Sequence, residues 1–130
     1  MLMAGEWNVA GDLRLPPDLR VLVVDDNEDA AKSLGLLLEM HGPRVLVVHD
    51  GISALDAIHR VQPHAILLDL GMPEMDGCEV ARVIRQDRRC EGIQLLALTG
   101  WGNEECRRMT ADAGFDHHLV KPVDLPHLIR

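Results

Sequence analysis

Four short aliphatic runs restrict the fold of this chain more than any other feature of its sequence. They are VLVV at 21–24, VLVV at 45–48, AILL at 65–68 and LLAL at 95–98. Continuous apolar runs of this length are typical of strands that are covered on both faces of a parallel sheet. The shorter segment HLV at 118–120 predicts a fifth strand.

The segments between the runs carry apolar residues at the spacing of a helix face. After Asn27, an expected N-cap, the first face consists of Ala30, Leu34, Leu37 and Leu38. The later faces include Ile52, Leu55 and Ile58, then Val80, Val83 and Ile84, and then Cys106, Met109 and Ala113. Strands that alternate with helices predict an α/β fold, a parallel sheet with helices on both faces.

The length and the charge of the chain restrict its class. The 130 residues suffice for one domain, which we expect over residues 20–130, preceded by a tail or linker at 1–19. A net charge of −8 argues against direct binding of nucleic acid, which usually requires a basic surface. No apolar stretch approaches the ~20 residues of a membrane span. The three cysteines lack a CxxC spacing and indicate a reduced, cytoplasmic protein.

Polar side chains follow four of the five predicted strands. Asp25 and Asp26 follow the first strand, Asp69 the third, Thr99 the fourth and Lys121 the fifth. The carboxyl ends of parallel strands lie at one edge of the sheet, and ligands of such folds bind beyond that edge. We therefore expect these five side chains to converge on one site.

Three neighbouring carboxylates repel one another, and a divalent cation would relieve that repulsion. Mg²⁺ prefers oxygen ligands and usually takes one or two carboxylates together with phosphate oxygens. A lysine ammonium and a threonine hydroxyl could hold a phosphoryl group beside it. One aspartate could then act as a nucleophile and form an aspartyl phosphate.

Each of these residues also has a simpler explanation. Asp25 could belong to a helix cap, Asp69 could be a turn residue, and Thr99 could cap its own loop. The convergence of all of them at one edge would then require four coincidences. The second strand ends on His49, which we expect outside the group if that strand lies at the edge of the sheet.

Four motifs together resemble a known family. They are VLVVDDNED at 21–29, ILLDLGMPEMDG at 66–77, LLALTG at 95–100 and LVKPVD at 119–124. In order and spacing, the sequence closely resembles the receiver domain of two-component response regulators, from about residue 20 to its end. The resemblance implies a flavodoxin-like, doubly wound fold with five parallel strands in the order 2-1-3-4-5.

The resemblance also implies a role for each residue of the predicted site. Asp69 corresponds to the phospho-accepting aspartate, which also faces the metal. Asp26 corresponds to the direct Mg²⁺ ligand, and Asp25 to the partner that acts mainly through metal-bound water. Gly71 would supply a backbone carbonyl to the same ion.

Further expectations concern the switch. Thr99 resembles the hydroxyl that moves to the phosphoryl oxygen, and Lys121 the lysine that pairs with the phosphate. The bond between Lys121 and Pro122 is expected to be cis. His118 stands where the family usually carries a switch aromatic residue, so a histidine would take its place. Trp101 is expected either to shield the acyl phosphate from water or to pack on the surface.

Receivers of this family accept a phosphoryl group from a phosphohistidine on a histidine kinase or a histidine phosphotransfer protein. Phosphorylation is expected to repack the face made by the fourth helix, the fifth strand and the fifth helix. Such a domain catalyses its own phosphorylation and dephosphorylation but is not a conventional turnover enzyme. Two alternatives stay open: an aspartyl-phosphate phosphatase or hydrolase, and a degenerate receiver that acts as a protein-binding module.

The end of the chain carries two more expectations. Residues 125–130 leave about two turns for the last helix, so that helix is expected to be incomplete. Apolar surface that it would normally cover favours a homodimer. The segments LTGWG and DHHLVKPVD resemble receivers attached to hybrid sensor histidine kinases more than those of transcription factors.

Overall fold

The computed structural model describes residues 18–72, 76–100 and 102–121. Within these ranges strands and helices alternate, as the sequence pattern predicts. The elements in chain order are β1 (Arg20–Val24), α2 (Glu28–Glu39), β2 (Arg44–Val48), α3 (Gly51–Val61), β3 (Ala65–Asp69), α4 (Gly77–Arg85), the 3₁₀-helix η1 (Arg88–Cys90), β4 (Gln94–Thr99), α5 (Glu104–Ala113) and β5 (His117–Val120).

The strands of the described chain form one parallel sheet in the order β2-β1-β3-β4-β5. This order confirms the predicted flavodoxin-like topology. The winding reverses between β1 and β3, and such a reversal opens a crevice at the carboxyl ends of the two strands. The sheet therefore directs the residues that follow β1 and β3 toward the same place.

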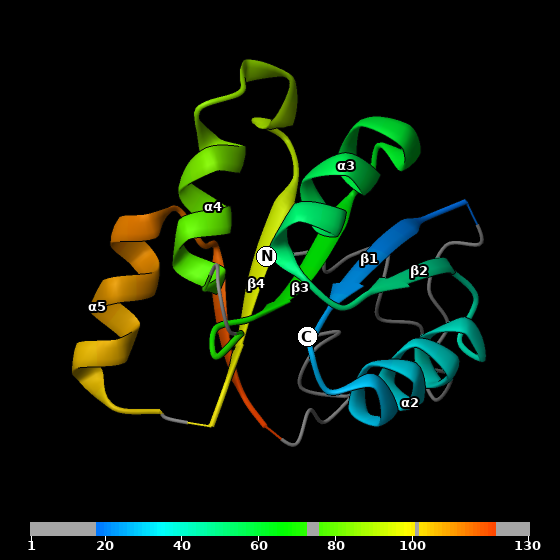
Figure 1. Cartoon of the computed structure of the whole chain (residues 1–130), viewed down its shortest axis with the longest axis horizontal. Coiled ribbons are helices and arrows are strands. Elements are labelled where there is room, and N and C mark those ends of the chain that lie inside the picture. Colours follow the sequence, from blue (N-terminus) through cyan, green and yellow to red (C-terminus); the bar gives the residue numbers. More distant parts are fainter. Residues whose placement is uncertain (1–17, 73–75, 101, 122–130) are drawn as a thin grey trace, which may run out of the picture.

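Alternate strand residues form two apolar layers, one on each face of the sheet. On one face, Leu22 and Val24 pack with residues of α3 and α4. On the other face, Val21 and Val23 pack with residues of α2. Figure 1 shows α2 and α3 on opposite sides of β1 and β2. All five residues of β3 are buried, because this central strand is covered on both faces.

The buried face of α2 is shifted by one residue from the predicted one. Ala31, Gly35 and Leu38 are buried, whereas Ala30 and Leu37 are exposed. A Cβ atom at position 35 would lie 2.8 Å from a methyl group of Val47, so the glycine lets α2 approach β2 closely. The prediction weighed apolar side chains and missed this small-residue contact.

The buried face of α5 also differs from the predicted one. Met109 is 53% exposed, and the neighbouring Thr110 is buried in its place. Ala113 is buried as predicted, and Cys106 is half-buried. Thr110 tolerates burial because its hydroxyl donates a hydrogen bond to the carbonyl oxygen of Arg107, at 2.9 Å.

Each α-helix of the described chain begins at an Asn or Asp whose side chain accepts a backbone hydrogen bond. The four caps, with N···O distances of 2.7–3.0 Å, are Asn27, Asp50, Asp76 and Asn103. Three of these caps end the loops that follow β1, β3 and β4. The caps therefore help to fix the loops that carry the predicted site.

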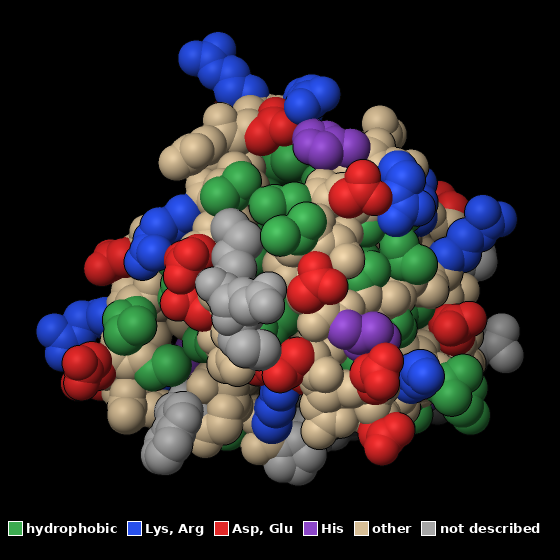
Figure 2. Space-filling view, in the orientation of Figure 1, with side chains coloured by type: hydrophobic (Ala, Val, Ile, Leu, Met, Phe, Trp, Pro, Cys, Tyr) green, Lys and Arg blue, Asp and Glu red, His purple; other side chains and the backbone are tan. Residues whose placement is uncertain are grey.

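Several predicted features fall outside the described residues. They are the tail or linker as far as residue 17, the incomplete last helix, the cis bond to Pro122 and the side chain of Trp101. Across the described ranges, no helix is both long enough and apolar enough to span a membrane. On the face shown in Figure 2, acidic and basic side chains are interspersed, with apolar side chains between them.

Candidate functional site

Three carboxylates meet beyond the carboxyl ends of β1 and β3. Oxygen atoms of Asp25, Asp26 and Asp69 all lie within 4.8 Å of one another. Asp25 and Asp69 are only 3% and 7% exposed, whereas Asp26 is exposed. The structure thus brings together three carboxylates that the sequence predicts to converge.

Lys121 extends from the end of β5 into this group. Its Nζ atom lies 3.0 Å from Oδ2 of Asp25 and 3.3 Å from Oδ1 of Asp69. Its backbone N–H donates a hydrogen bond of 2.8 Å to the carbonyl oxygen of Thr99, which ties β5 to the end of β4. Thr99 is the last residue of β4. The predicted site residues therefore come from the carboxyl ends of four strands, β1, β3, β4 and β5.

The charges of the site do not balance, and the pKa values of its groups reflect this. Burial and the negative charge of Asp25 raise the pKa of Asp69, although the N–H of Gly71 and the ammonium of Lys121 oppose the rise. Burial alone would lower the pKa of Lys121, but contacts with Asp25 and Asp69 outweigh burial and raise it. Lys121 therefore stays protonated at neutral pH and offsets only one of three carboxylates.

A hard divalent cation fits this set of ligand atoms. The three candidate side-chain ligands are carboxylates, whose oxygen atoms Mg²⁺ prefers over nitrogen or sulfur. Opposite ligands in an octahedral Mg²⁺ site lie ~4.2 Å apart, twice a bond length of ~2.1 Å. The limit of 4.8 Å between the carboxylate oxygens is close to that span. A bound cation would also remove the repulsion that the single lysine leaves.

Two glycines shape the loop after β3. Gly71 donates its backbone N–H to Oδ1 of Asp69, at 3.2 Å. The predicted role of its carbonyl as a metal ligand stays a prediction. A Cβ atom at Gly77 would lie 2.5 Å from the carbonyl oxygen of Asp69 and 2.9 Å from Cα of Leu70. The absence of a side chain at Gly77 therefore allows α4 to begin directly against the end of β3.

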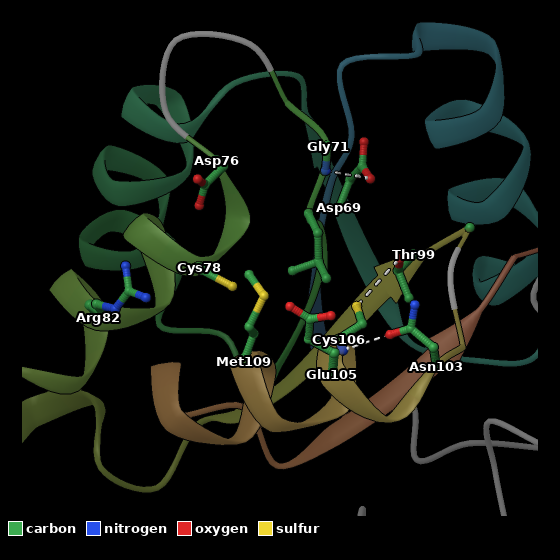
Figure 3. A pocket seen from close by; sticks show the side chains of 12 residues that line it. Asp69, Gly71, Asp76, Cys78, Arg82, Thr99, Asn103, Glu105, Cys106 and Met109 are labelled. Atoms are coloured by element: carbon green, nitrogen blue, oxygen red, sulfur yellow. Dashed lines mark hydrogen bonds between the residues drawn. The ribbon is translucent and has the colours of Figure 1, made fainter.

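Asp69 and Thr99 share a cavity of about 460 Å³ that opens between α4 and α5. Thr99 is buried, and its Oγ1 atom lies 3.9 Å from Sγ of Cys106 on α5. Met109 and Cys78 line the cavity farther from Asp69 (Figure 3). A phosphoryl donor can therefore approach Asp69 from this side although the residue itself is largely buried.

His118 contacts α5. Its Nδ1 atom lies 3.3 Å from Oγ1 of Thr110. Since the Thr110 hydroxyl donates its hydrogen to Arg107, it can only accept from His118. His117 lies on the opposite face of β5, where its Nε2 atom is 3.3 Å from Oε1 of Gln94 and burial lowers its pKa. The two histidines therefore do not converge on one metal site.

His49 does not join the group of carboxylates, but it contacts the backbone that carries them. β2 does lie at the edge of the sheet, yet Nδ1 of His49 is 3.0 Å from the carbonyl oxygen of Asp25. The register pairs Val48 with Val24, so the residues that follow these two valines are neighbours. The sequence signal was the same as for the other residues, a polar side chain directly after a predicted strand.

Comparisons with known proteins show the family of the chain. The model of the response regulator receiver domain matches residues 21–130. The chain belongs to this family. The response regulator MprA of Mycobacterium tuberculosis is 39% identical over 111 residues, which cover 85% of this chain and 47% of MprA. This receiver chain thus spans about half the length of the MprA proteins it matches.

Two solved structures extend the likeness of this receiver chain to three dimensions. The chemotaxis protein CheY4 of Vibrio cholerae matches with a TM-score of 0.81 and 27% identity, over 85% of this chain and 92% of CheY4. The receiver domain of the sensor histidine kinase PA1611 from Pseudomonas aeruginosa matches with a TM-score of 0.77 and 31% identity, over 85% and 90%. In PA1611 a magnesium ion is coordinated in the active site cleft.

Proposed function

We propose that this receiver accepts a phosphoryl group on Asp69, with Mg²⁺ held by Asp25, Asp26, Asp69 and the carbonyl of Gly71. The observation that carries the proposal is the unbalanced charge at the carboxyl edge of the sheet. Lys121 contacts two of the three carboxylates, and one of these two, Asp69, lines an open cavity. Such a site is suited to a cation and a phosphoryl group together.

The phosphoryl donor is a phosphohistidine of a histidine kinase or a phosphotransfer protein. A carboxylate oxygen of Asp69 attacks the phosphorus, a new O–P bond forms and the P–N bond of the donor breaks. The electron pair of that bond returns to the ring nitrogen, and the donor leaves as neutral imidazole when its other nitrogen carries a proton. The product is an aspartyl phosphate.

The residues of this chain lower the barrier mainly by electrostatics. Lys121 already contacts Oδ1 of Asp69, so it can pair with a phosphoryl oxygen after transfer with little movement. The N–H of Gly71 holds the same carboxylate in a fixed direction. When bound, Mg²⁺ supplies the positive charge that keeps Asp69 ionised and neutralises the phosphoryl oxygens.

The switch begins at Thr99. Its hydroxyl group lies near Cys106 in the cavity that Asp69 also lines. From there the hydroxyl group can move toward a phosphoryl oxygen on Asp69 and donate a hydrogen bond to it. α5 contacts this region twice, through Cys106 beside Thr99 and through Thr110 beside His118. We therefore propose that α5 and β5, with His118 in place of the usual aromatic residue, form the part of the surface that changes.

Exposed apolar side chains give that surface a capacity to bind a protein. Met109 on α5 is 53% exposed and Val120 on β5 is 43% exposed. The partner that we propose for this surface is a second copy of the chain. Sedimentation velocity before and after phosphorylation tests the proposal, which requires a larger dimer fraction in the phosphorylated sample.

Intact-protein mass spectrometry tests the proposed phosphorylation. The chain is incubated with a small acyl-phosphate donor, with Mg²⁺ or with a chelator, as wild type and as Asp69→Ala. One phosphoryl adduct that requires both the metal and Asp69 supports the receiver. The absence of any adduct would favour the degenerate receiver, and rapid release of phosphate over many cycles would favour the hydrolase.

A further inference from the structure

The histidine at the end of β2 is bonded to the loop that carries two of the proposed metal ligands. Nδ1 of His49 lies 3.0 Å from the carbonyl oxygen of Asp25. One step earlier, the backbone N–H of Asp25 donates a hydrogen bond of 3.2 Å to the carbonyl oxygen of Val48. The backbone hydrogen bonds between β1 and β2 end at Asp25 and Val48. The next hydrogen bond between the two chain segments is made by the side chain of His49.

The chemistry of this bond fixes the hydrogen on the ring. A carbonyl oxygen can only accept, so Nδ1 of His49 carries the hydrogen whether the ring is neutral or charged. Nε2 faces Oε1 of Glu28 at 3.9 Å, which is too far for a hydrogen bond. The hydrogen bond to the carbonyl oxygen of Asp25 therefore requires a donor at the position of Nδ1, and it forms whether or not the ring is charged.

Asp26 lies between two peptide groups that are both held. The peptide that joins Asp25 to Asp26 is held at its oxygen by His49. The peptide that joins Asp26 to Asn27 is held at its nitrogen, which donates to Oδ1 of Asp25 at 3.0 Å. Only the first of these two restraints comes from outside the loop, because His49 belongs to another strand.

The two aspartates of the loop differ in how their side chains are held. The Asp25 carboxylate is fixed by Lys121 on one oxygen and by the N–H of Asn27 on the other. In the described part of the chain, no hydrogen-bond donor contacts the carboxylate of Asp26, which is exposed. The direction of Asp26 therefore depends on its own backbone, and hence on the peptide that His49 holds.

We propose that His49 is a positioning residue for the metal, which fixes the peptide that directs Asp26 toward the cation. This inference rests on the proposed function, because it assumes that Asp26 binds Mg²⁺. Loss of the bond lets the peptide rotate, and part of the binding free energy is then spent on ordering Asp26. We expect the dissociation constant for Mg²⁺ to rise about three- to tenfold, the worth of one hydrogen bond.

Three substitutions separate the bond from the bulk of the ring. In His49→Asn, the Nδ2 atom stands at the same number of bonds from Cα as Nδ1, so it can still donate to Asp25. In His49→Gln, the amide nitrogen stands one bond farther out, where Nε2 lies. In His49→Ala, no donor remains. Amide NMR shifts recorded during a titration with Mg²⁺ give the dissociation constant of each variant.

We expect the Ala and Gln variants to bind Mg²⁺ more weakly than the wild type. The Asn variant should have nearly the same dissociation constant as the wild type. The rate of phosphorylation at saturating Mg²⁺ should stay near the wild-type rate, while the Mg²⁺ concentration for half of that rate rises. Glu28→Gln serves as the control, because it changes the charge near Nε2 and leaves the bond to Asp25 in place. Its dissociation constant should stay within about twofold of wild type.

Two results would overturn the inference. One is an Ala variant that binds Mg²⁺ as tightly as the wild type, and the other is an Asn variant that binds as weakly as the Ala variant. Urea unfolding of each variant verifies that the compared proteins are folded. Wild-type protein that binds no Mg²⁺ at all would instead contradict the proposed function, and the inference with it.

Discussion

The sheet carries a network of charged side chains at each end, and the two networks differ in their balance of positive and negative charge. At the carboxyl ends of the strands, Lys121 faces three carboxylates. At the amino ends of β4 and β5, Arg85 faces Asp116 alone, with Nη2 2.7 Å from Oδ2. The first network leaves net negative charge, whereas the second has one cation for one anion.

Arg85 and Asp116, the second network, also form hydrogen bonds with the backbone. Arg85 donates to the carbonyl oxygens of Gly114, Cys90 and Ile93, at distances of 2.9–3.1 Å. Asp116 in turn accepts the backbone N–H of Leu95 at 2.8 Å. This network joins the end of α4 to the segments before β4 and β5. The balanced network therefore stabilises the fold, whereas the unbalanced network at the other end of the sheet is the one for which we propose a ligand.

The largest effect on stability is expected from Arg85→Ala. The substitution leaves the exposed Asp116 without its cation and removes the donor of three carbonyl groups, two of which belong to the buried residues Cys90 and Ile93. The free energy of unfolding should fall by about 3 kcal/mol, mainly because the three carbonyl groups lose a charged hydrogen-bond donor. Urea unfolding followed by circular dichroism measures the change.

Arg60→Ala is the matched control, because Arg60 pairs with Asp56 on the surface of α3. The two side chains are 60% and 71% exposed, so solvent screens their attraction. The expected loss is about 0.5 kcal/mol or less. Equal losses in the two variants would contradict the view that the Arg85 network stabilises the fold.

The second prediction concerns Mg²⁺ and the unbalanced network. At about a hundred times its dissociation constant, Mg²⁺ should stabilise the wild type by about 2.7 kcal/mol, because it binds the folded state. The increment should vanish in Asp26→Asn and persist in Arg85→Ala. Urea unfolding with Mg²⁺, compared with NaCl at the same ionic strength, provides the measurement. An increment that survives in Asp26→Asn would place the ion elsewhere.

The smallest effect is expected from Asp69→Asn without metal. Folding raises the pKa of Asp69, so the stability that this group contributes is fully present below its unfolded pKa. That stability is lost as the pH rises through the folded pKa, from pH ~4 upward. The Asn variant avoids this loss and should be more stable at pH 7 by on the order of 1 kcal/mol.

The pH profile distinguishes this explanation from a general effect of the substitution. The two proteins should have similar stability at pH 4 and diverge toward pH 7, and Mg²⁺ should reverse the difference. Thermal unfolding at a series of pH values, with and without Mg²⁺, follows the divergence. A constant difference at every pH would mean that the charge of Asp69 is not its cause.

The strands and the convergence of the site could be predicted because both follow from local patterns. Each aliphatic run predicts a strand, and parallel strands bring the residues after them to one edge. The residues Asp25, Asp26, Asp69, Thr99 and Lys121 meet there for that reason alone. Their chemical roles came from the family resemblance, because no spacing rule tells a nucleophile from a metal ligand.

Other features depend on contacts that local patterns do not contain. The place of His49 depends on the register of β2 against β1. Gly77 is required because the start of α4 comes close to the end of β3. Arg85 bonds to Gly114 and Asp116, which lie 29 and 31 residues along the chain. The buried faces of α2 and α5 were predicted from apolar side chains and missed Gly35 and Thr110.

One measurement tests most directly that the unbalanced network is a phosphoryl site on Asp69. The chain is phosphorylated with a small acyl-phosphate donor and reduced with borohydride, which converts an aspartyl phosphate into homoserine. Tandem mass spectrometry of the peptides then locates the modified residue. We predict homoserine at position 69, formed with Mg²⁺ and absent when a chelator is present. Homoserine at another aspartate, or none at all, would contradict the account.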